Sequence, residues 1–142
     1  MSLSFGARIP FVEHLGFTLE LFENGHSEMH YRPLPEHLNS FDVAHGGAIM
    51  TFLDVLMATA ARSVAPAMGV VTIEMKTSFM RPVISHDNEN LVGKGVLLHR
   101  TKSMAFTESK VFDAQGQICA HATGTFKYMP RPQTPASQIS TD

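Results

Sequence analysis

The sequence has a single cysteine, Cys119, among its 142 residues. One thiol cannot form an internal disulfide, and the sequence has no cysteine pair of the kind that forms a zinc knuckle. The eight histidines, among them His14, His26, His30 and His37, lack the tight spacing of metal ligands, so we expect no metal site. This cysteine usage favours a cytoplasmic protein.

A strong charge bias and long apolar runs are also lacking. The net charge of −2 argues against nucleic acid as the general partner. The longest apolar stretch is interrupted by Asp54 and is too short to cross a bilayer, and MSLSFGARIPF lacks the apolar core of a signal peptide. With 44% hydrophobic and 17% charged residues, the chain is expected to form one soluble domain without nucleic-acid or membrane partners.

The most informative stretch is residues 39–62, NSFDVAHGGAIMTFLDVLMATAAR. After Gly46 and Gly47, apolar residues recur at the spacing of one helix face: Ile49, Phe52, Leu53, Leu56, Met57 and Ala60. The opposite side carries small residues and one carboxylate, Asp54, which predicts a buried helix. A buried carboxylate is costly unless it is paired or used, so Asp54 has either a buried cation as partner or a chemical role.

Strand patterns occur on both sides of this helix. Residues 17–22 and 27–32 are predicted to pair around Asn24-Gly25, after a short helix over residues 9–15. Residues 70–80 alternate, which predicts one face with Val71, Ile73, Met75, Thr77 and Phe79 and another with Thr72, Glu74, Lys76 and Ser78. Further strands are expected over residues 91–100, 103–112 and 117–128.

The central helix is the only element available to cover the apolar face of such a sheet. We therefore predict an α+β fold in which a curved antiparallel sheet wraps around one long helix. Residues 1–128 form this single domain. Residues 129–142 contain three prolines and many Ser, Thr and Gln residues, which predicts a disordered tail.

Several motifs occur together. His45-Gly46-Gly47 begins six positions after Asn39, and Asp54 comes nine positions after the histidine. The strand VTIEMKTSFMRP and the hairpin TKSMAFTESKVFDAQGQICAHATGTF follow. With these motifs the chain resembles the hotdog-fold acyl-CoA thioesterases of the His-Gly-Gly branch, similar to the phenylacetyl-CoA and 4-hydroxybenzoyl-CoA thioesterases. It departs from them at Asp42, where a Gly is frequent, and at Ala58, where some relatives carry a Ser.

The resemblance implies a role for each matching residue. Asp54 would attack the thioester carbonyl or act as general base for water, and the Gly46 amide would hold the thioester oxygen. Asn39 would help to position the carbonyl or the water, His45 would shape the site, and Thr72 would orient the attacking water. The site would straddle a homodimer, with Asp54 and Thr72 from one subunit and the other residues from its partner. Two dimers would form a tetramer.

The implied substrate is an acyl-CoA, hydrolysed to free acid and CoA without a cofactor. Apolar and small helix residues are predicted to line the acyl pocket and to favour aromatic or medium-chain groups: Gly47, Met50, Met57, Ala58 and Ala61. Residues near strand ends are predicted to bind CoA: Arg81, Arg100, Lys102 and Ser103.

Other interpretations remain open. The main alternative is a non-catalytic acyl-CoA-binding module on the same fold, although the intact set of Asn39, Gly46 and Asp54 argues against it. A hotdog dehydratase would use a His and an acid in a Pro-Gly-rich arrangement, which is missing. His45 also fits a helix cap, and Thr72 an ordinary strand residue.

Overall fold

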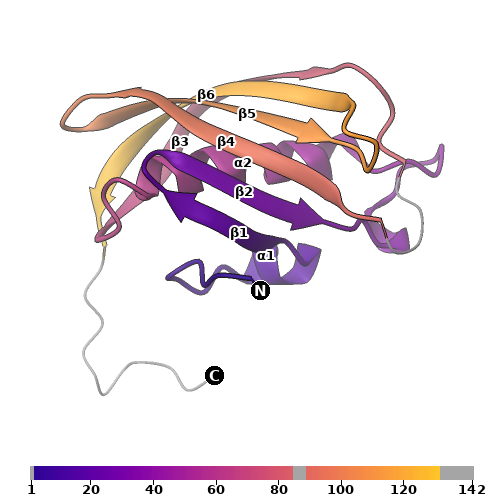
Figure 1. Ribbon diagram of the computed structural model, residues 1–142, viewed down its shortest axis with the longest axis horizontal. Helices are drawn as coiled ribbons and strands as arrows, with labels where there is room; N and C mark the ends of the chain where they lie inside the picture. The colour runs from indigo at the N-terminus through magenta and orange to yellow at the C-terminus, as the bar shows by residue number, and fades with distance from the viewer. Residues whose placement is uncertain (1, 85–88, 132–142) are drawn as a thin grey trace.

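One long helix and one antiparallel sheet form the body of the computed structural model, which describes residues 2–84 and 89–131. The helix α2 (Gly46–Arg62) lies against a six-stranded sheet with the order β1-β2-β4-β5-β6-β3. The strands are β1 (Thr18–Glu23), β2 (His26–Tyr31), β3 (Met68–Phe79), β4 (Leu91–Arg100), β5 (Met104–Phe112) and β6 (Ile118–Pro130). A short helix, α1 (Pro10–Leu15), and a 3₁₀ turn, η1 (Pro35–His37), precede α2. Figure 1 shows the sheet curving across α2, as predicted.

The predicted apolar face of α2 is the centre of the core. All six of its residues, from Ile49 to Ala60, are at most 1% exposed. Three buried hydroxyls from the sheet also donate to backbone carbonyls of this helix: Ser27 to Leu56 (2.6 Å), Ser109 to Leu53 (3.0 Å) and Tyr128 to Ala61 (2.7 Å). These contacts fix the helix against the concave face of the sheet both by apolar burial and by hydrogen bonds.

Gly93 and Gly95 allow β4 to cross α2 closely. A Cβ atom on Gly95 would lie 2.5 Å from Ser27 Oγ and 2.8 Å from the Leu56 carbonyl carbon. We expect Gly95→Ala to lower the free energy of unfolding by roughly 2–4 kcal/mol, because the backbone of neither element can move away without cost. Urea denaturation followed by circular dichroism measures this loss. Gly69→Ala on β3 is the control, since its Cβ would meet no atom closer than 3.7 Å, and equal losses in the two variants would contradict the prediction.

The two faces of β3 differ from the prediction. A β-bulge between Thr72 and Glu74 adds one residue to the strand, so Thr72 pairs with the buried Phe126 and lies on the inner face with Met75, Thr77 and Phe79. A one-residue shift exchanges the faces of every residue on one side of it. The prediction that Val71 and Ile73 share a face with Met75 is therefore wrong. Both lie on the outer face, where they are 46% and 52% exposed.

The chain ends differ slightly from the predicted boundaries. β6 continues to Pro130, which pairs with Met68, so residues 129 and 130 belong to the sheet and not to a disordered tail. Arg131 is in neither a helix nor a strand, and residues 132–142 of the predicted tail lie outside the described residues. Within the described ranges, none of the helices has the length and apolar character needed to cross a membrane.

Candidate functional site

Asp54 lies in the middle of α2, on the side that the sheet leaves uncovered. The Thr72 hydroxyl donates to its Oδ1 over 2.7 Å. Burial raises the pKa of Asp54, and the hydrogen bond from Thr72 opposes part of this increase. No lysine, arginine or histidine of the described residues forms an ion pair with it. The interpretation of Asp54 as a structural acid paired with a buried cation is therefore wrong for the part of the chain that the structure describes.

The uncovered side of α2 forms one stripe. Gly47, Met50, Asp54 and Ala58 recur at three- and four-residue spacing; the first two are exposed, and Asp54 and Ala58 are partly buried. Met57 does not belong to this stripe. It is fully buried, and its terminal methyl group would lie 3.0 Å from a Cβ atom on Gly124. The prediction that Met57 lines an acyl pocket is therefore wrong, because this side chain faces β6 and not the uncovered side.

The predicted pocket residue Ala61 is also fully buried. Its carbonyl accepts the hydroxyl of Tyr128, so it packs under the end of β6. Ala61 is therefore a core residue like Met57, and the predicted pocket lining is reduced to the residues of the uncovered stripe.

The start of α2 presents a free backbone donor. His45 is the N-cap: its Nδ1 accepts the Gly47 amide over 2.8 Å, and its carbonyl accepts the amides of Ala48 and Ile49. The Gly46 amide has no acceptor among the described residues. Because free amides at a helix start are oriented donors in a favourable dipole, this N–H is suited to hold an oxyanion. The capping interpretation of His45 is confirmed.

Asn39 stands at the beginning of the loop that leads into α2. Its Oδ1 accepts the amides of Phe41 (2.8 Å) and Val43 (3.3 Å), so the side-chain oxygen stabilises the loop. Only the Nδ2 group then remains to donate to a ligand. Asp42 has a φ of +59°, a left-handed conformation that glycine adopts most easily, which explains why a Gly is frequent at this position in the proteins that the chain resembles.

A cleft of about 390 Å³ is lined by Gly46. Its wall is mainly apolar and includes residues that no sequence motif assigns to the site: Phe79 and Met80, each 52% exposed, together with Ile49 and Val83. Phe79 Cζ lies only 3.5 Å from the position that a Cβ on Gly46 would occupy. Two large apolar residues next to each other at the end of a strand, before Arg81-Pro82, were the available signal.

The predicted CoA-binding residues lie at two ends of the protomer. Arg81 lines the cleft beside Gly46, and its Nη1 donates to Gln117 Oε1 over 2.7 Å. The Arg100 guanidinium lies 4.3 Å from the ring centre of Tyr128, whose hydroxyl contacts the last turns of α2. Lys102 and Ser103 are exposed in the adjacent β4–β5 connection. One protomer therefore does not bring these residues together.

The acid and the free amide are also separated. Asp54 comes eight positions after Gly46 on the same helix, which places them about 12 Å apart along its axis. One thioester carbonyl cannot contact both groups within one protomer. The expectation that two chains share the site stays a prediction.

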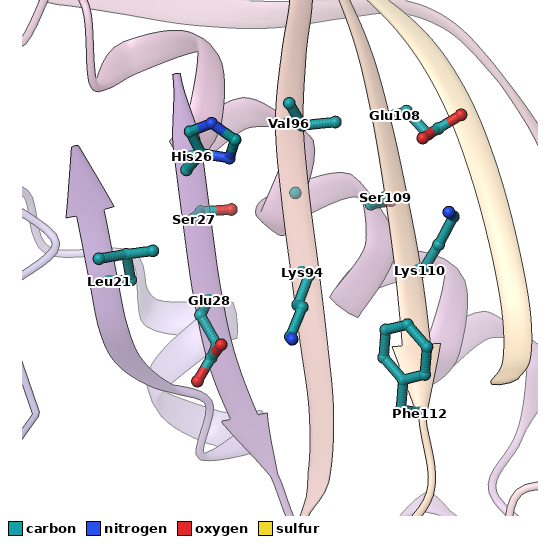
Figure 2. A pocket seen from close by; sticks show the side chains of 11 residues that line it. Leu21, His26, Ser27, Glu28, Lys94, Val96, Glu108, Ser109, Lys110 and Phe112 are labelled. Carbon is teal, nitrogen blue, oxygen red and sulfur yellow. The ribbon is translucent and has the colours of Figure 1, made fainter. Parts of the chain in front are cut away.

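A second groove lies on the outer face of the sheet, away from α2. Figure 2 shows Glu28, Lys94, Glu108 and Lys110 around it, and its volume is about 340 Å³. These residues alternate along their strands with inward-facing ones, so they cannot reach Asp54 or Gly46. Among the described residues no group of three or more His, Cys, Asp or Glu side chains is arranged to hold a metal ion.

Comparison with known proteins identifies the family. The model of the thioesterase superfamily matches residues 41–120, which include the helix start, Asp54 and Thr72. The chain belongs to the thioesterase superfamily. Its fold is the hotdog fold, as predicted. A protein of Thermoplasma acidophilum is 26% identical to this chain over 123 residues, which cover 82% of this chain and 86% of that protein. Its name assigns it provisionally to the esterases.

Solved structures show the same fold. A conserved protein of Pseudomonas aeruginosa superposes on this thioesterase-family chain with a TM-score of 0.81 at 23% identity, over 87% of this chain and 97% of that one. The Escherichia coli PaaI protein of the phenylacetic acid degradation operon gives a TM-score of 0.77 at 18% identity, over 84% and 83%. Membership of the superfamily supports thioester hydrolysis as the general chemistry of the chain.

Proposed function

We propose that this thioesterase hydrolyses an acyl-CoA with an aromatic or medium-chain acyl group. The observation that carries the proposal is the state of Asp54: a carboxylate with a raised pKa, hydrogen-bonded to Thr72 and without a cationic partner among the described residues. A carboxylate of this kind is a stronger base than an exposed one, and it is free to accept a proton from water.

In the proposed reaction Asp54 takes a proton from a water molecule as the water oxygen bonds to the thioester carbonyl carbon. The Gly46 amide stabilises the negative charge that develops on the carbonyl oxygen, and Nδ2 of Asn39 contributes a second donor. The C–S bond then breaks, and the CoA sulfur leaves with a proton. Direct attack by the carboxylate, followed by hydrolysis of the resulting anhydride, is the other route that the same residues allow.

The proposed site needs two chains, with Asp54 and Thr72 from one and Asn39, His45 and Gly46 from the other. The distance along α2 supports this, and so does the edge strand β3. One edge of β3 has no strand partner in the described protomer, and the strand exposes Val71 and Ile73 on its outer face. Such an edge favours pairing with another chain. The proposal therefore includes a homodimer, two of which form a tetramer.

The cleft beside Gly46 supports the choice of acyl group. Phe79, Met80 and Ile49 offer an apolar wall next to Gly46, the proposed oxyanion donor, and Arg81 also lines the cleft. An aromatic ring or an alkyl chain fits such a wall better than a charged group does. The buried free thiol of Cys119 fits a reducing compartment, so the proposal places the enzyme in the cytoplasm.

A hydrolysis screen tests the proposed function. Purified protein is incubated with acyl-CoAs that differ in chain length and ring substituents, and the release of the free CoA thiol is followed with a thiol reagent. We expect cleavage of aromatic or medium-chain members and little cleavage of dicarboxylic ones. Tight binding of acyl-CoAs without cleavage would instead identify a non-catalytic binding module, and light scattering that finds only monomers would contradict the shared site.

Asp54 and Thr72 should set the pH profile of hydrolysis. Because the base must be ionised, kcat/KM should rise with pH through the pKa of Asp54, above the ordinary range of an aspartate. The Thr72 hydrogen bond lowers this pKa, so Thr72→Val should move the acid limb to higher pH. Thr125→Val is the control, because it removes a similar 2.7 Å bond to Glu74 on the outer face. An unchanged acid limb in Thr72→Val would exclude Asp54 as the titrating base.

A further inference from the structure

A buried imidazole and a buried phenol lie beneath the loop that precedes α2. His37 in η1 is 6% exposed, and Tyr31 at the end of β2 is 1% exposed. The Tyr31 hydroxyl lies 2.9 Å from His37 Nδ1, and the Leu34 amide donates to the same nitrogen over 3.1 Å. An amide N–H can only donate, so Nδ1 carries no proton and the Tyr31 hydroxyl is a second donor. Burial raises the pKa of Tyr31 to about 12, which keeps this donor protonated at neutral pH.

These contacts determine the tautomer of His37. With Nδ1 as acceptor, the neutral ring carries its proton on Nε2, which is buried without a hydrogen-bond partner in the described part of the chain. The ring of His14 lies edge-on, with 5.8 Å between the two centroids. A buried N–H without a hydrogen-bond partner destabilises the folded chain. This cost must be offset by other contacts, and the two hydrogen bonds at Nδ1 are the polar contacts that the ring makes.

The backbone of His37 closes the loop that carries the candidate site. Its carbonyl accepts the His45 amide over 2.8 Å. The neighbouring pair, Leu38 and Ala44, forms an isolated antiparallel bridge. Asn39 follows this closure on one side and Gly46 on the other. Backbone contacts therefore tie η1 to both ends of the loop that carries Asn39 and leads to the start of α2.

We propose that His37 is a positioning residue of the thioesterase site: its Nδ1, held by Tyr31, fixes the loop so that Nδ2 of Asn39 and the Gly46 amide face the same acyl-CoA carbonyl. This inference rests on the proposed function. His37 does not line the cleft and acts only through the residues that it holds. Because these donors bind most strongly to the charge of the transition state, loss of the Nδ1 contacts should reduce kcat more than it changes KM.

Two substitutions at His37 separate positioning from mere packing. In His37→Asn, the Oδ1 atom is as many bonds from Cα as Nδ1 and can accept both donors, whereas His37→Leu has no acceptor. We expect kcat to fall about 10- to 100-fold in His37→Leu, with KM changed by less than this, and to recover largely in His37→Asn. Tyr31→Phe should lose less, because the Leu34 bond remains.

Thr107→Val is the matched control. It removes another buried side-chain hydrogen bond, from Thr107 to the Gly124 carbonyl (2.8 Å), within the sheet and not in the loop before α2. Its kcat should equal that of the wild type. A loss as large as that of His37→Leu would mean that any buried hydrogen bond has this effect, and it would overturn the positioning role.

Hydrogen exchange at the His45 amide gives a readout independent of turnover. Faster exchange in His37→Leu and normal protection in His37→Asn support the proposal. Wild-type kcat and protection in His37→Leu, or equal losses in both variants, would overturn it. If His37→Leu fails to fold, Tyr31→Phe replaces it: a kcat below that of the wild type with faster exchange at the His45 amide supports the proposal, and wild-type values of both overturn it. If the wild type cleaves no acyl-CoA, the proposed function fails, while the exchange pattern still shows whether His37 holds the loop.

Discussion

Asp54→Asn is expected to lower kcat for acyl-CoA hydrolysis by about 10²- to 10⁴-fold, because an amide cannot accept the proton of the attacking water. The substituted side chain keeps an oxygen that can accept the Thr72 hydroxyl, so the fold should be preserved. Steady-state assays of CoA release measure the loss, and circular dichroism checks the fold. Asp113→Asn is the control, since this aspartate accepts backbone amides in the β5–β6 turn.

The same variant should be more stable than the wild type at neutral pH. The pKa of Asp54 is raised in the folded chain, so the unfolded chain loses this proton first and stability falls as the pH rises between the ordinary and the raised pKa. Asp54→Asn removes this loss. Its advantage in the free energy of unfolding should vanish in acid, where both states are protonated. Full activity in Asp54→Asn, or a lower stability at neutral pH, would contradict the role or the burial assigned to this acid.

Gly46→Pro is expected to reduce kcat by about 10²- to 10³-fold, the usual effect of losing one oxyanion donor. Proline removes the free N–H but is well tolerated at the first position of a helix. The preceding residue, His45, already has φ −60° and ψ 137°, the extended conformation that a following proline requires. Gly46→Ala is the control: it keeps the amide, and its Cβ would meet Phe79 at an ordinary 3.5 Å.

Mixing the two inactive variants tests whether the site is shared. In a heterodimer of Asp54→Asn and Gly46→Pro chains, one site combines the intact Gly46 of the first chain with the intact Asp54 of the second. Activity should therefore reappear when the two proteins exchange subunits. A mixture that exchanges subunits and stays inactive would place both groups of the site on the same chain, or Gly46 outside it. If Gly46→Ala lost as much activity as Gly46→Pro, side-chain volume and not the amide would explain the effect.

The sequence was sufficient for the architecture, because the apolar face of α2 and the alternation of the long strands are repeating patterns. It failed where a single residue changes the pattern. Ile73 gives no sign that the strand bulges there, since it is an ordinary strand residue, and this bulge turns Thr72 toward Asp54. Met57 satisfies the helical spacing of the core face and was also assigned to the pocket, and only packing against β6 decides between the two.

The sequence indicated the motif residues of the candidate site, but it did not indicate the residues that surround them. Asn39, Gly46 and Asp54 are close in sequence, so their spacing can be read directly. The cleft forms because the end of β3 meets the start of α2, and Phe79 and Met80 come together with Gly46 only in three dimensions. The contact between Tyr31 and His37 likewise joins a strand end to a separate turn, which local patterns do not reveal.

The two edges of the sheet are protected unequally. At β1, Leu3 forms an antiparallel bridge with Leu19, and the pairing of β1 with β2 shifts register between Leu19 and Leu21. At β3, no such cover exists among the described residues. Strand addition can continue from copy to copy only if both edges accept a neighbour. In the proposed homodimer, pairing through β3 would therefore end with two copies, and the bridge at β1 would disfavour an open-ended fibre.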